Sequence, residues 1–417
     1  MITYKGIDYL RGKLKRKANR VKVRYRYYEM KNIVRDFGIS TPPDLRFWMG
    51  TLGWCATSVD ALANRLMFRT FDNDLYNMNE IFSNNNKDVM IDSAILGALI
   101  SSCDFIYIAP DESGYPRMRV IDGMHATGEI DVTTNLLKEG YAVLERDSQN
   151  RPTLEAYFLP KATYYFEAGK LSRVVSHSAP YPLLVPIINR PDAVRPFGHS
   201  RISRASMSIV GSAVRTAKRS EIASEFYSYP QKYVLGMDDS AEQMDKWKAT
   251  MSSLLRIDKD MDGGVPHVGQ FSQQSMSPHT EQLRMFAGLF AGETGLTLDD
   301  LGFPSQNPSS AEAIKASHES LRLTARKAQR DFGTGLLNTG YLAACIRDNY
   351  SYSRAEIANV QPKWEPIFEP DASALSVIGD GTIKINQAIP GYFDKDNLRD
   401  LTGVEAADVN TSDIIEV

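Results

Sequence analysis

Cysteine and histidine are scarce, and neither occurs at the spacing of a metal site. The 417 residues include three cysteines, Cys55, Cys103 and Cys345, and six histidines scattered along the chain. The cysteines match neither a disulfide framework nor a zinc site, so we expect assembly in a reducing compartment. We therefore predict no bound metal and no cofactor.

Apolar runs long enough to span a bilayer are also missing. The longest apolar stretch, Ile91 to Ile108, is interrupted by Asp92 and Asp104, whereas a membrane helix needs roughly 20 consecutive apolar residues. The first 26 residues are rich in Lys and Arg and contain no apolar segment typical of a secretory signal. We expect neither a signal peptide nor contact with a membrane.

An excess of positive charge is absent as well. The chain has 48 Lys and Arg against 51 Asp and Glu, which gives a net charge of −3. A protein that coats nucleic acid relies on many cations to neutralise phosphates. Any contact with DNA must therefore be local or repulsive. With 43% hydrophobic and 24% charged residues, the chain should fold around a sizeable core.

Known catalytic motifs do not occur: there is no phosphate-binding P-loop, no HExxH zinc motif and no nucleophile elbow. The alternating carboxylates Asp258, Asp260 and Asp262 resemble the first half of a calcium loop. The second half fails, because Pro266 occupies the ninth position and Gly269 stands where the bidentate glutamate belongs. We interpret this segment as an acidic surface turn and predict no catalytic residue.

The first half of the chain predicts a mixed structure. Apolar residues at three- and four-residue spacings indicate helices between residues 44 and 102. From Cys103 to Ser178, short β-rich runs alternate with turn residues, which is typical of an antiparallel meander. We expect residues 27–195 to form one α+β unit.

The basic segment 1–26 has two interpretations. It is either a solvated helix face or flexible arm, or it binds nucleic acid or an acidic scaffold or capsid surface. The nearby Tyr25, Tyr27 and Tyr28 favour a docked segment.

The second half predicts long helices around a small insert. No proline occurs between Pro196 and Pro230, and apolar residues from Ile202 to Phe226 share one helical face. After this helix we expect a βαβ-like insert, with strands at Tyr233–Leu235 and Val265–Phe271 and with Trp247 on its helix. A second helix should be capped by Ser277 and end at Gly295, and a loop should follow from Leu296 to Pro308. A third, long helix should run from the capping box Ser309–Glu312 to about Phe332, with a further segment to Arg347.

Three stretches of sequence carry a resemblance to a known family. They are Pro196-Phe197-Gly198-His199-Ser200-Arg201-Ile202, Glu293-Thr294-Gly295-Leu296 through Leu301-Gly302, and Asn307-Pro308-Ser309-Ser310-Ala311-Glu312-Ala313-Ile314. In this order and spacing they resemble the portal subunits of long-tailed bacteriophages. The resemblance implies an α+β fold with an α/β wing, a helical stem, a small α/β clip, a long wing helix and a short helical crown, assembled in a ring.

The resemblance also divides the chain. The expected parts are a basic N-terminal arm (1–26), the first part of the wing (27–195), a stem helix (196–229), the clip (230–275), a second stem helix (276–295), the tunnel loop (296–308), the long helix and return of the wing (309–370), and the crown (371–417).

The function that the resemblance implies is structural. Portal subunits form a dodecameric ring at one capsid vertex of the virion, through which double-stranded DNA enters and leaves. The implied partners are the terminase motor during packaging, head-completion or adaptor proteins afterwards, and the major capsid and scaffold proteins. Assembly takes place in the host cytoplasm, and no enzymatic activity is expected.

Two groups of site residues follow from the resemblance. The tunnel loop should present Leu298, Asp299, Asp300, Leu301 and Phe303 to the DNA channel, where two adjacent carboxylates would repel the DNA backbone. The plainer alternative is that these aspartates cap or solvate a surface turn. The clip should dock partners through Trp247, Asp258, Asp260 and Asp262.

Two other functions stay open at this point. One is a metal-dependent DNA-processing enzyme of the packaging apparatus that uses the carboxylates from Asp258 to Asp262. The other is a head-completion or scaffold-like protein without a channel. Negative-stain microscopy separates the three hypotheses, because only a portal gives rings with a central hole.

Overall fold

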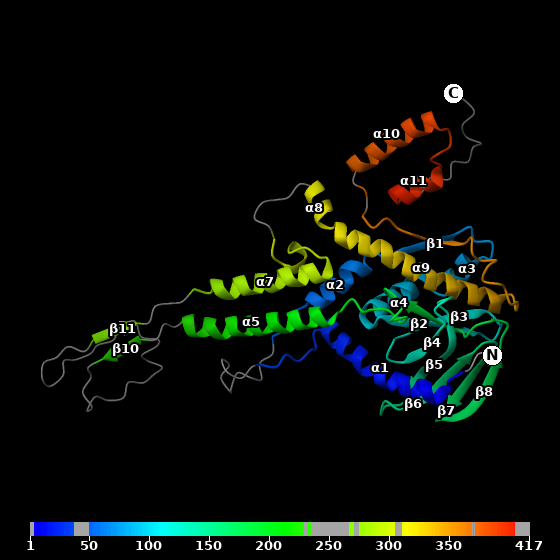
Figure 1. Ribbon diagram of the computed structural model, residues 1–417, viewed down its shortest axis with the longest axis horizontal. Coiled ribbons are helices and arrows are strands. Elements are labelled where there is room, and N and C mark those ends of the chain that lie inside the picture. The colour runs from blue at the N-terminus through cyan, green and yellow to red at the C-terminus, as the bar shows by residue number, and fades with distance from the viewer. Residues whose placement is uncertain are drawn as a thin grey trace.

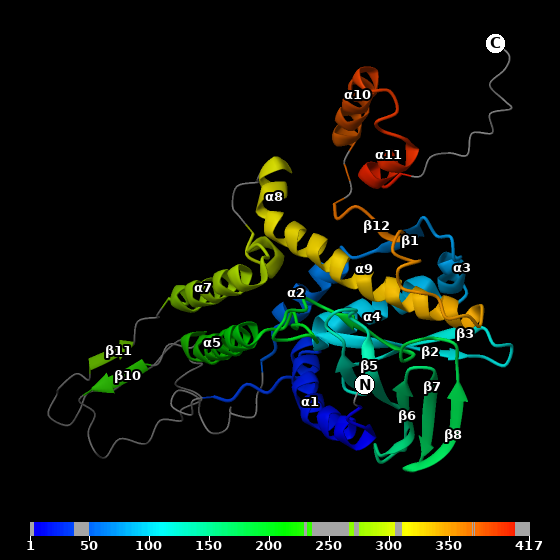
Figure 2. The same cartoon turned by 45° about the vertical axis from the view of Figure 1, so that its right-hand side comes forward.

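The computed structural model describes residues 4–36, 50–228, 232–235, 267–270, 275–304, 311–368, 370 and 372–404. Helices and antiparallel sheets pack into one body, from which two long helices project side by side (Figures 1 and 2). The α+β class predicted from the sequence is confirmed. None of the helices in the described ranges is both long and apolar enough for a bilayer crossing.

The N-terminal part of the body is helical with one inserted strand. Its elements are α1 (Ile7–Tyr28), α2 (Trp54–Ala63), β1 (Phe68–Asp72), α3 (Met78–Ser83) and α4 (Lys87–Ser101). The prediction of helices alone between residues 44 and 102 is wrong at β1. This strand pairs antiparallel with β12 (Gln361–Trp364), and Phe68 lies opposite Trp364. A partner so distant in sequence leaves no local signal.

Two antiparallel sheets follow. The strands are β2 (Cys103–Pro110), β3 (Pro116–Ile121), β4 (Ala126–Ile130), β5 (Leu137–Arg146), β6 (Pro152–Leu159), β7 (Ala162–Glu167), β8 (Lys170–Ser176) and β9 (Leu184–Ile188). The larger sheet has the order β4-β5-β6-β7-β8, and the smaller has the order β3-β2-β9. The antiparallel meander predicted for this part of the chain is confirmed.

The main core lies where α4 and α9 (Glu319–Arg347) pack against the smaller sheet. The C-terminal half of α9 is almost entirely buried, from Phe332 to Ile346. All three cysteines are buried and free. Burial raises the pKa of the Cys55 and Cys103 thiols to about 12, so they are poor nucleophiles at neutral pH.

Helix α1 is docked on the body, as its tyrosines suggest. Leu10 and Leu14 are buried against the larger sheet. Arg11 forms a 2.7 Å ion pair with Glu155, and Lys13 forms a 2.6 Å ion pair with Glu129. These contacts give several cations of the N-terminal segment partners within the same subunit.

The projecting pair consists of α5 (Arg204–Ser228) and α7 (Ser277–Thr294), with β10 (Lys232–Leu235) and β11 (His267–Gln270) beyond their ends. The two predicted helices are confirmed. One detail differs, because Met276 rather than Ser277 occupies the cap position of α7. The two strands predicted for the insert are present and pair as antiparallel neighbours, and the helix predicted between them lies outside the described residues.

The C-terminal part contains four helices among the described residues. The predicted third long helix is divided into α8 (Ala311–Ser317) and α9, with the break at His318 and no break near Phe332. Helices α10 (Ala372–Ala388) and α11 (Lys395–Thr402) lie beside each other above α9. The short 3-10 helix η2 (Asp299–Leu301) precedes α8.

Candidate channel and docking elements

A tight turn leads from the smaller sheet into α5. Gly198 has φ +70°, and a Cβ built on it would overlap the carbonyl oxygen of Asn189. The backbone NH of His199 donates to that oxygen at 2.8 Å, and the Asn189 side chain donates to the carbonyl of His199 at 2.7 Å. Glycine is therefore required at this position of the first sequence stretch.

The next two residues of the same stretch anchor the start of α5 to the body. The hydroxyl of Ser200 donates to the carbonyl of Ile100 at 2.6 Å. The guanidinium of Arg201 donates to the carbonyl of Ser58 on α2 at 3.2 Å and to the carbonyl of Thr294 at the end of α7. Burial lowers the pKa of Arg201 to about 10. One buried cation thus ties α2 and α7 to the start of α5.

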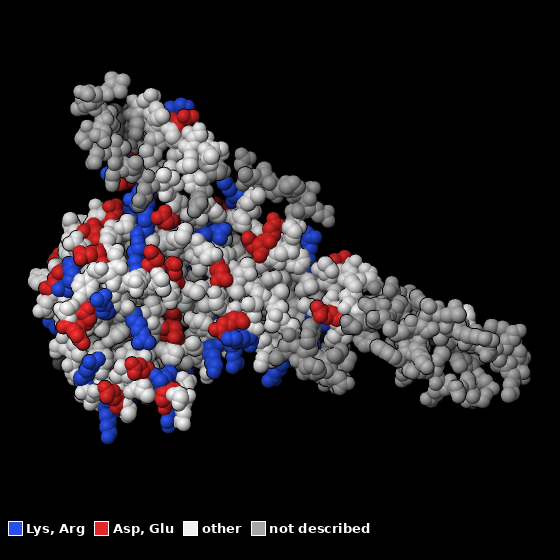
Figure 3. All heavy atoms as spheres, turned by 180° about the vertical axis from the view of Figure 1, so that it is seen from behind, with Lys and Arg blue, Asp and Glu red and all other residues white. Residues whose placement is uncertain are grey.

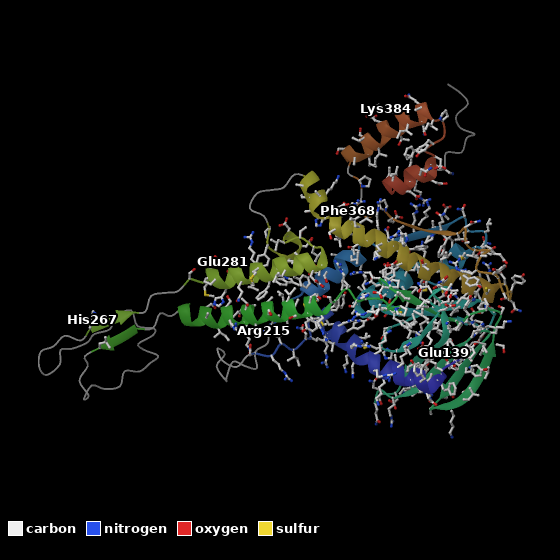
Figure 4. All side chains as sticks on the ribbon, viewed as in Figure 1. Glu139, Arg215, His267, Glu281, Phe368 and Lys384 are labelled. Atoms are coloured by element: carbon white, nitrogen blue, oxygen red, sulfur yellow. The ribbon has the colours of Figure 1, made fainter. Side chains whose placement is uncertain are left out.

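Polar contacts also join the two projecting helices along their length. Ser203 donates to Glu293 at 2.7 Å near the body, and Thr216 donates to Gln282 at 2.9 Å farther out. Figure 4 labels Arg215 on α5 and Glu281 on α7. We call α5 and α7 together the hairpin.

Helix α7 ends at Gly295, which has φ +68° and opens the predicted tunnel loop. The described part of this loop, residues 296–304, contains a reciprocal cap. The Asp300 carboxylate accepts from the backbone NH of Thr297 at 2.8 Å and from its hydroxyl at 2.9 Å, and the NH of Asp300 approaches the Thr297 hydroxyl at 3.2 Å. This pattern is that of a capping box at the start of η2.

The five predicted loop residues have different environments in the subunit. Leu301 is 7% exposed, and Leu298 and Phe303 pack against the core cluster while remaining partly exposed. Asp299 is exposed, and Asp300 is half-buried. The loop therefore offers one exposed carboxylate and a second one that also serves as a cap.

The predicted clip residues Trp247, Asp258, Asp260 and Asp262 lie outside the described residues. Of the segment 230–275, the structure describes β10, β11 and Ser275. Strands β10 and β11 lie beyond the ends of the hairpin and away from the body, with His267 labelled in Figure 4. Within the described ranges, no group of three or more His, Cys, Asp or Glu side chains is arranged to hold a metal.

Two buried ionisable side chains behind the turn into α5 were not predicted from the sequence. The Asp104 carboxyl is almost fully buried, and burial raises its pKa to about 7. The ammonium of Lys17 is buried near it, 4.8 Å from the ring centre of Phe197, and has no hydrogen-bond partner among the described residues. Burial lowers the pKa of Lys17. Asp104 had appeared only as an interruption in an apolar run.

A second unpredicted contact fastens α11 to the body. The Asp400 carboxylate pairs with Arg69 of β1 and, at 2.6 Å, with Lys363 of β12. On the face of the molecule seen in Figure 3, Lys and Arg side chains are interspersed with Asp and Glu side chains over the body.

Two curated proteins are similar in sequence to this chain. No family model matches the sequence. The portal protein of Mycobacterium phage L5 is 24% identical over 333 residues, covering 74% of this chain and 67% of that protein. The portal protein of Mycobacterium phage D29 is 23% identical over 333 residues with the same coverage.

Solved structures of particle necks are also similar. The neck of a native GTA particle has a TM-score of 0.47 and 15% identity over 84% of this chain and 89% of that chain. The virion of a native gene transfer agent particle has a TM-score of 0.48 and 14% identity over 92% of this chain and 99% of that chain. The resemblance to portal proteins that the three sequence stretches indicate is confirmed by the two curated phage relatives, and the chain is a homologue of these proteins.

Proposed function

We propose that this chain is a portal subunit, one copy of the ring that forms the DNA channel at a capsid vertex. The observation that carries this proposal is the similarity to two curated portal proteins over 333 residues. The long hairpin and the loop that follows it support the proposal, because they place β10 and β11 far from the body and leave residues 296–304 at the base of the hairpin.

Ring assembly is proposed from the surface of the single subunit. Met285 and Leu289 on α7 are 53% and 55% exposed, and Val377 and Ile383 on α10 are 72% and 59% exposed. These side chains are candidates for burial between neighbouring subunits, and a head-to-tail interface that closes on itself gives a ring. Native mass spectrometry and negative-stain microscopy should show closed rings with a central hole, dodecameric in the virion. A stable monomer at micromolar concentration in physiological salt would contradict the proposal.

The tunnel loop is proposed to repel DNA through Asp299 and Asp300. Because Asp300 also caps η2, replacing it would cost about 0.5–2 kcal/mol of stability and confuse the interpretation. We therefore choose Asp299→Lys, which changes the charge of a twelve-subunit ring by about 24. This variant should assemble rings but package less DNA, because a cationic lining binds the phosphates that must slide past it.

The measurement is the amount of nuclease-protected DNA per head over a series of salt concentrations. The defect should ease as salt screens the attraction. Glu112→Lys, a substitution of an exposed carboxylate in the turn between β2 and β3, is the matched control and should package normally. Wild-type yield for Asp299→Lys at every salt concentration would show that this carboxylate does not act on DNA.

The segment 230–275 is proposed to be the clip, which contacts neighbouring subunits, the terminase motor and later the head-completion or adaptor proteins. The position of β10 and β11 beyond the hairpin supports this role. Trp247→Ala should lower the melting temperature of the assembled ring, and an unchanged melting profile would count against the assignment.

We also propose that the chain is not an enzyme and that its location is the capsid vertex of the virion. Metal-dependent nicking of DNA by the purified chain, abolished when Asp258, Asp260 and Asp262 are changed to Asn, would instead support a DNA-processing enzyme. Particles that contain the chain but show no central hole would support a head-completion or scaffold protein.

A further inference from the structure

A cationic groove runs between α9 and β12, two elements that lie side by side in the structure. Its cavity volume is about 720 Å³. Its lining comes from α9, between Leu323 and Leu337, and from Gln361, Pro362 and Trp364 of β12. This volume falls within the range of ligand-binding clefts, and none of the functions discussed above uses it.

The charge of the groove is of one sign. Arg326, Lys327 and Arg330 are exposed cations on the outer face of α9, and none of them forms a salt bridge with a described residue. No acidic side chain is among the lining residues. The amide nitrogen of Gln329 is buried without a hydrogen-bond partner in the described part of the chain. The groove therefore offers donors and positive charge that carboxylates can satisfy.

Part of the remaining lining is apolar. Leu323 is 55% exposed, although it is a large apolar side chain. A Cβ built on Gly333 would lie 2.7 Å from the Pro362 ring, so the helix and the strand are in close contact there. Trp364 completes this wall and packs edge-on against Phe68 at 5.6 Å between ring centres. A groove that combines cations with exposed apolar surface fits a peptide carrying both carboxylates and aliphatic side chains.

One segment of the chain has this composition and begins close to the groove. Residues 405–417 contain Glu405, Asp408, Asp413 and Glu416, no Lys, Arg or His, and the apolar pair Ile414 and Ile415.

The residues that directly precede this segment lie close to β12. Asp400 is ion-paired at 2.6 Å with Lys363, which is the neighbour of Trp364 in β12. A Cβ built on Gly403 would lie 3.3 Å from the ring of Pro366. Thirteen residues can extend roughly 45 Å. This length is enough to reach the groove from Gly403, because Trp364, which lines the groove, is next to Lys363 in β12 and close to Pro366 in the chain.

We propose that residues 405–417 bind in the groove between α9 and β12 of the same subunit, with their carboxylates on Arg326, Lys327 and Arg330 and their aliphatic side chains on the apolar wall. Duplex DNA is the weaker candidate. Its contacts are dominated by phosphates spaced along an extended cationic surface, whereas much of this lining is apolar and the cavity is small. The inference does not depend on the portal role.

Cysteine cross-linking in the full chain tests the proposal. Thr334→Cys places a thiol on the exposed edge of the groove, and Ile414→Cys places its partner in the segment. The native cysteines are buried, so they compete little for oxidation. Under mild oxidation this double variant should form a disulfide within one subunit, found as a linked peptide by mass spectrometry and as a monomer on a non-reducing gel.

The matched control keeps Ile414→Cys and moves the other thiol to Lys384→Cys, an exposed position on α10 that is labelled in Figure 4. It should cross-link at least fivefold less. Adding Arg326→Ala and Arg330→Ala to the test variant should lower its cross-linking severalfold, and raising the salt concentration should do the same because it screens the attraction.

Three outcomes would overturn the proposal. The first is cross-linking no greater than in the control, and the second is a disulfide that joins two subunits. The third combines two results. Adding a duplex oligonucleotide changes the tryptophan fluorescence, and this change is lost with Arg326→Ala and Arg330→Ala. At the same time, neither salt nor these substitutions alter the cross-linking. That result would assign the groove to DNA.

Discussion

The buried carboxyl group of Asp104 should make the stability of the body depend on pH. Its Oδ1 accepts from the Ser101 hydroxyl at 2.8 Å and from the backbone NH of Gly123 at 2.9 Å. Its Oδ2 faces Gly97 so closely that a Cβ there would overlap it. Asp104→Asn keeps the shape of this side chain and the acceptor Oδ1, but it removes the ionisable group.

The direction of the effect follows from the raised pKa. Burial holds the pKa of Asp104 at about 7, above its ordinary value of 3.8, so the folded state keeps a proton that the unfolded chain loses. The stability contributed by the protonated group is fully present below pH 3.8 and is lost as the pH rises through about 7. At 1.36 kcal/mol for each pKa unit, the loss is on the order of 4 kcal/mol.

The assay is urea unfolding followed by fluorescence at several pH values between 4 and 8. As the pH rises over this range, the unfolding free energy of Asp104→Asn should increase relative to that of wild type by ~4 kcal/mol. Asp111→Asn is the control. The pKa of the exposed Asp111 is held at about 2 by a hydrogen bond from Ser113 and by other donors, so that variant should differ from wild type by a constant amount. Parallel curves for wild type and Asp104→Asn would refute the reasoning.

Three further substitutions test the junction between the hairpin and the body. Gly198→Ala should lower the unfolding free energy by about 3 kcal/mol or more, because it combines a positive φ with overlap of a carbonyl oxygen, whereas Gly292→Ala, in open space on α7, should be neutral or slightly stabilising by calorimetry. Arg201→Met should cost about 2–3 kcal/mol in urea unfolding, because it removes charged hydrogen bonds to two backbone carbonyls. Lys17→Met should raise the melting temperature, because it keeps the aliphatic packing and removes a buried ammonium without a partner; a lower melting temperature would show that this charge is stabilised in the folded state.

The sequence predicted the long helices because their signals are local. Helix α5 lies between two prolines with an apolar stripe along one face, and α7 ends at a glycine in the left-handed conformation. The strand β1 was missed because its partner is β12, which only the folded chain brings near. The break between α8 and α9 at His318 was also missed, since the residues around it are compatible with a continuous helix.

In the candidate site, too, features with a local sequence signal were predicted, and features that depend on tertiary packing were not. The two carboxylates of the loop were found from the sequence, and the alternative that an aspartate caps a turn is the arrangement observed for Asp300. The packing of Leu298 and Leu301 into the core depends on the surrounding elements. The buried Lys17 and Asp104 could not have been predicted, because lysine and aspartate are rarely buried and nothing in their neighbourhoods marks them.

The first two of the sequence stretches that resemble portal proteins meet in the folded chain. Arg201, from the first stretch, donates to the carbonyl of Thr294, from the second. Gly295 of the second stretch faces α9, because a Cβ built on it would lie 2.8 Å from the hydroxyl of Ser320.

The loop after that glycine reaches the break between α8 and α9, where Asp300 lies 3.8 Å from His318. Each stretch alone is a common turn or helix end, and none would identify a family by itself. The first two meet at one junction, where α2, α5, α7 and α9 come together, so a change in one of them must fit the others. The spacing between the stretches is therefore more informative than the residues of any single one.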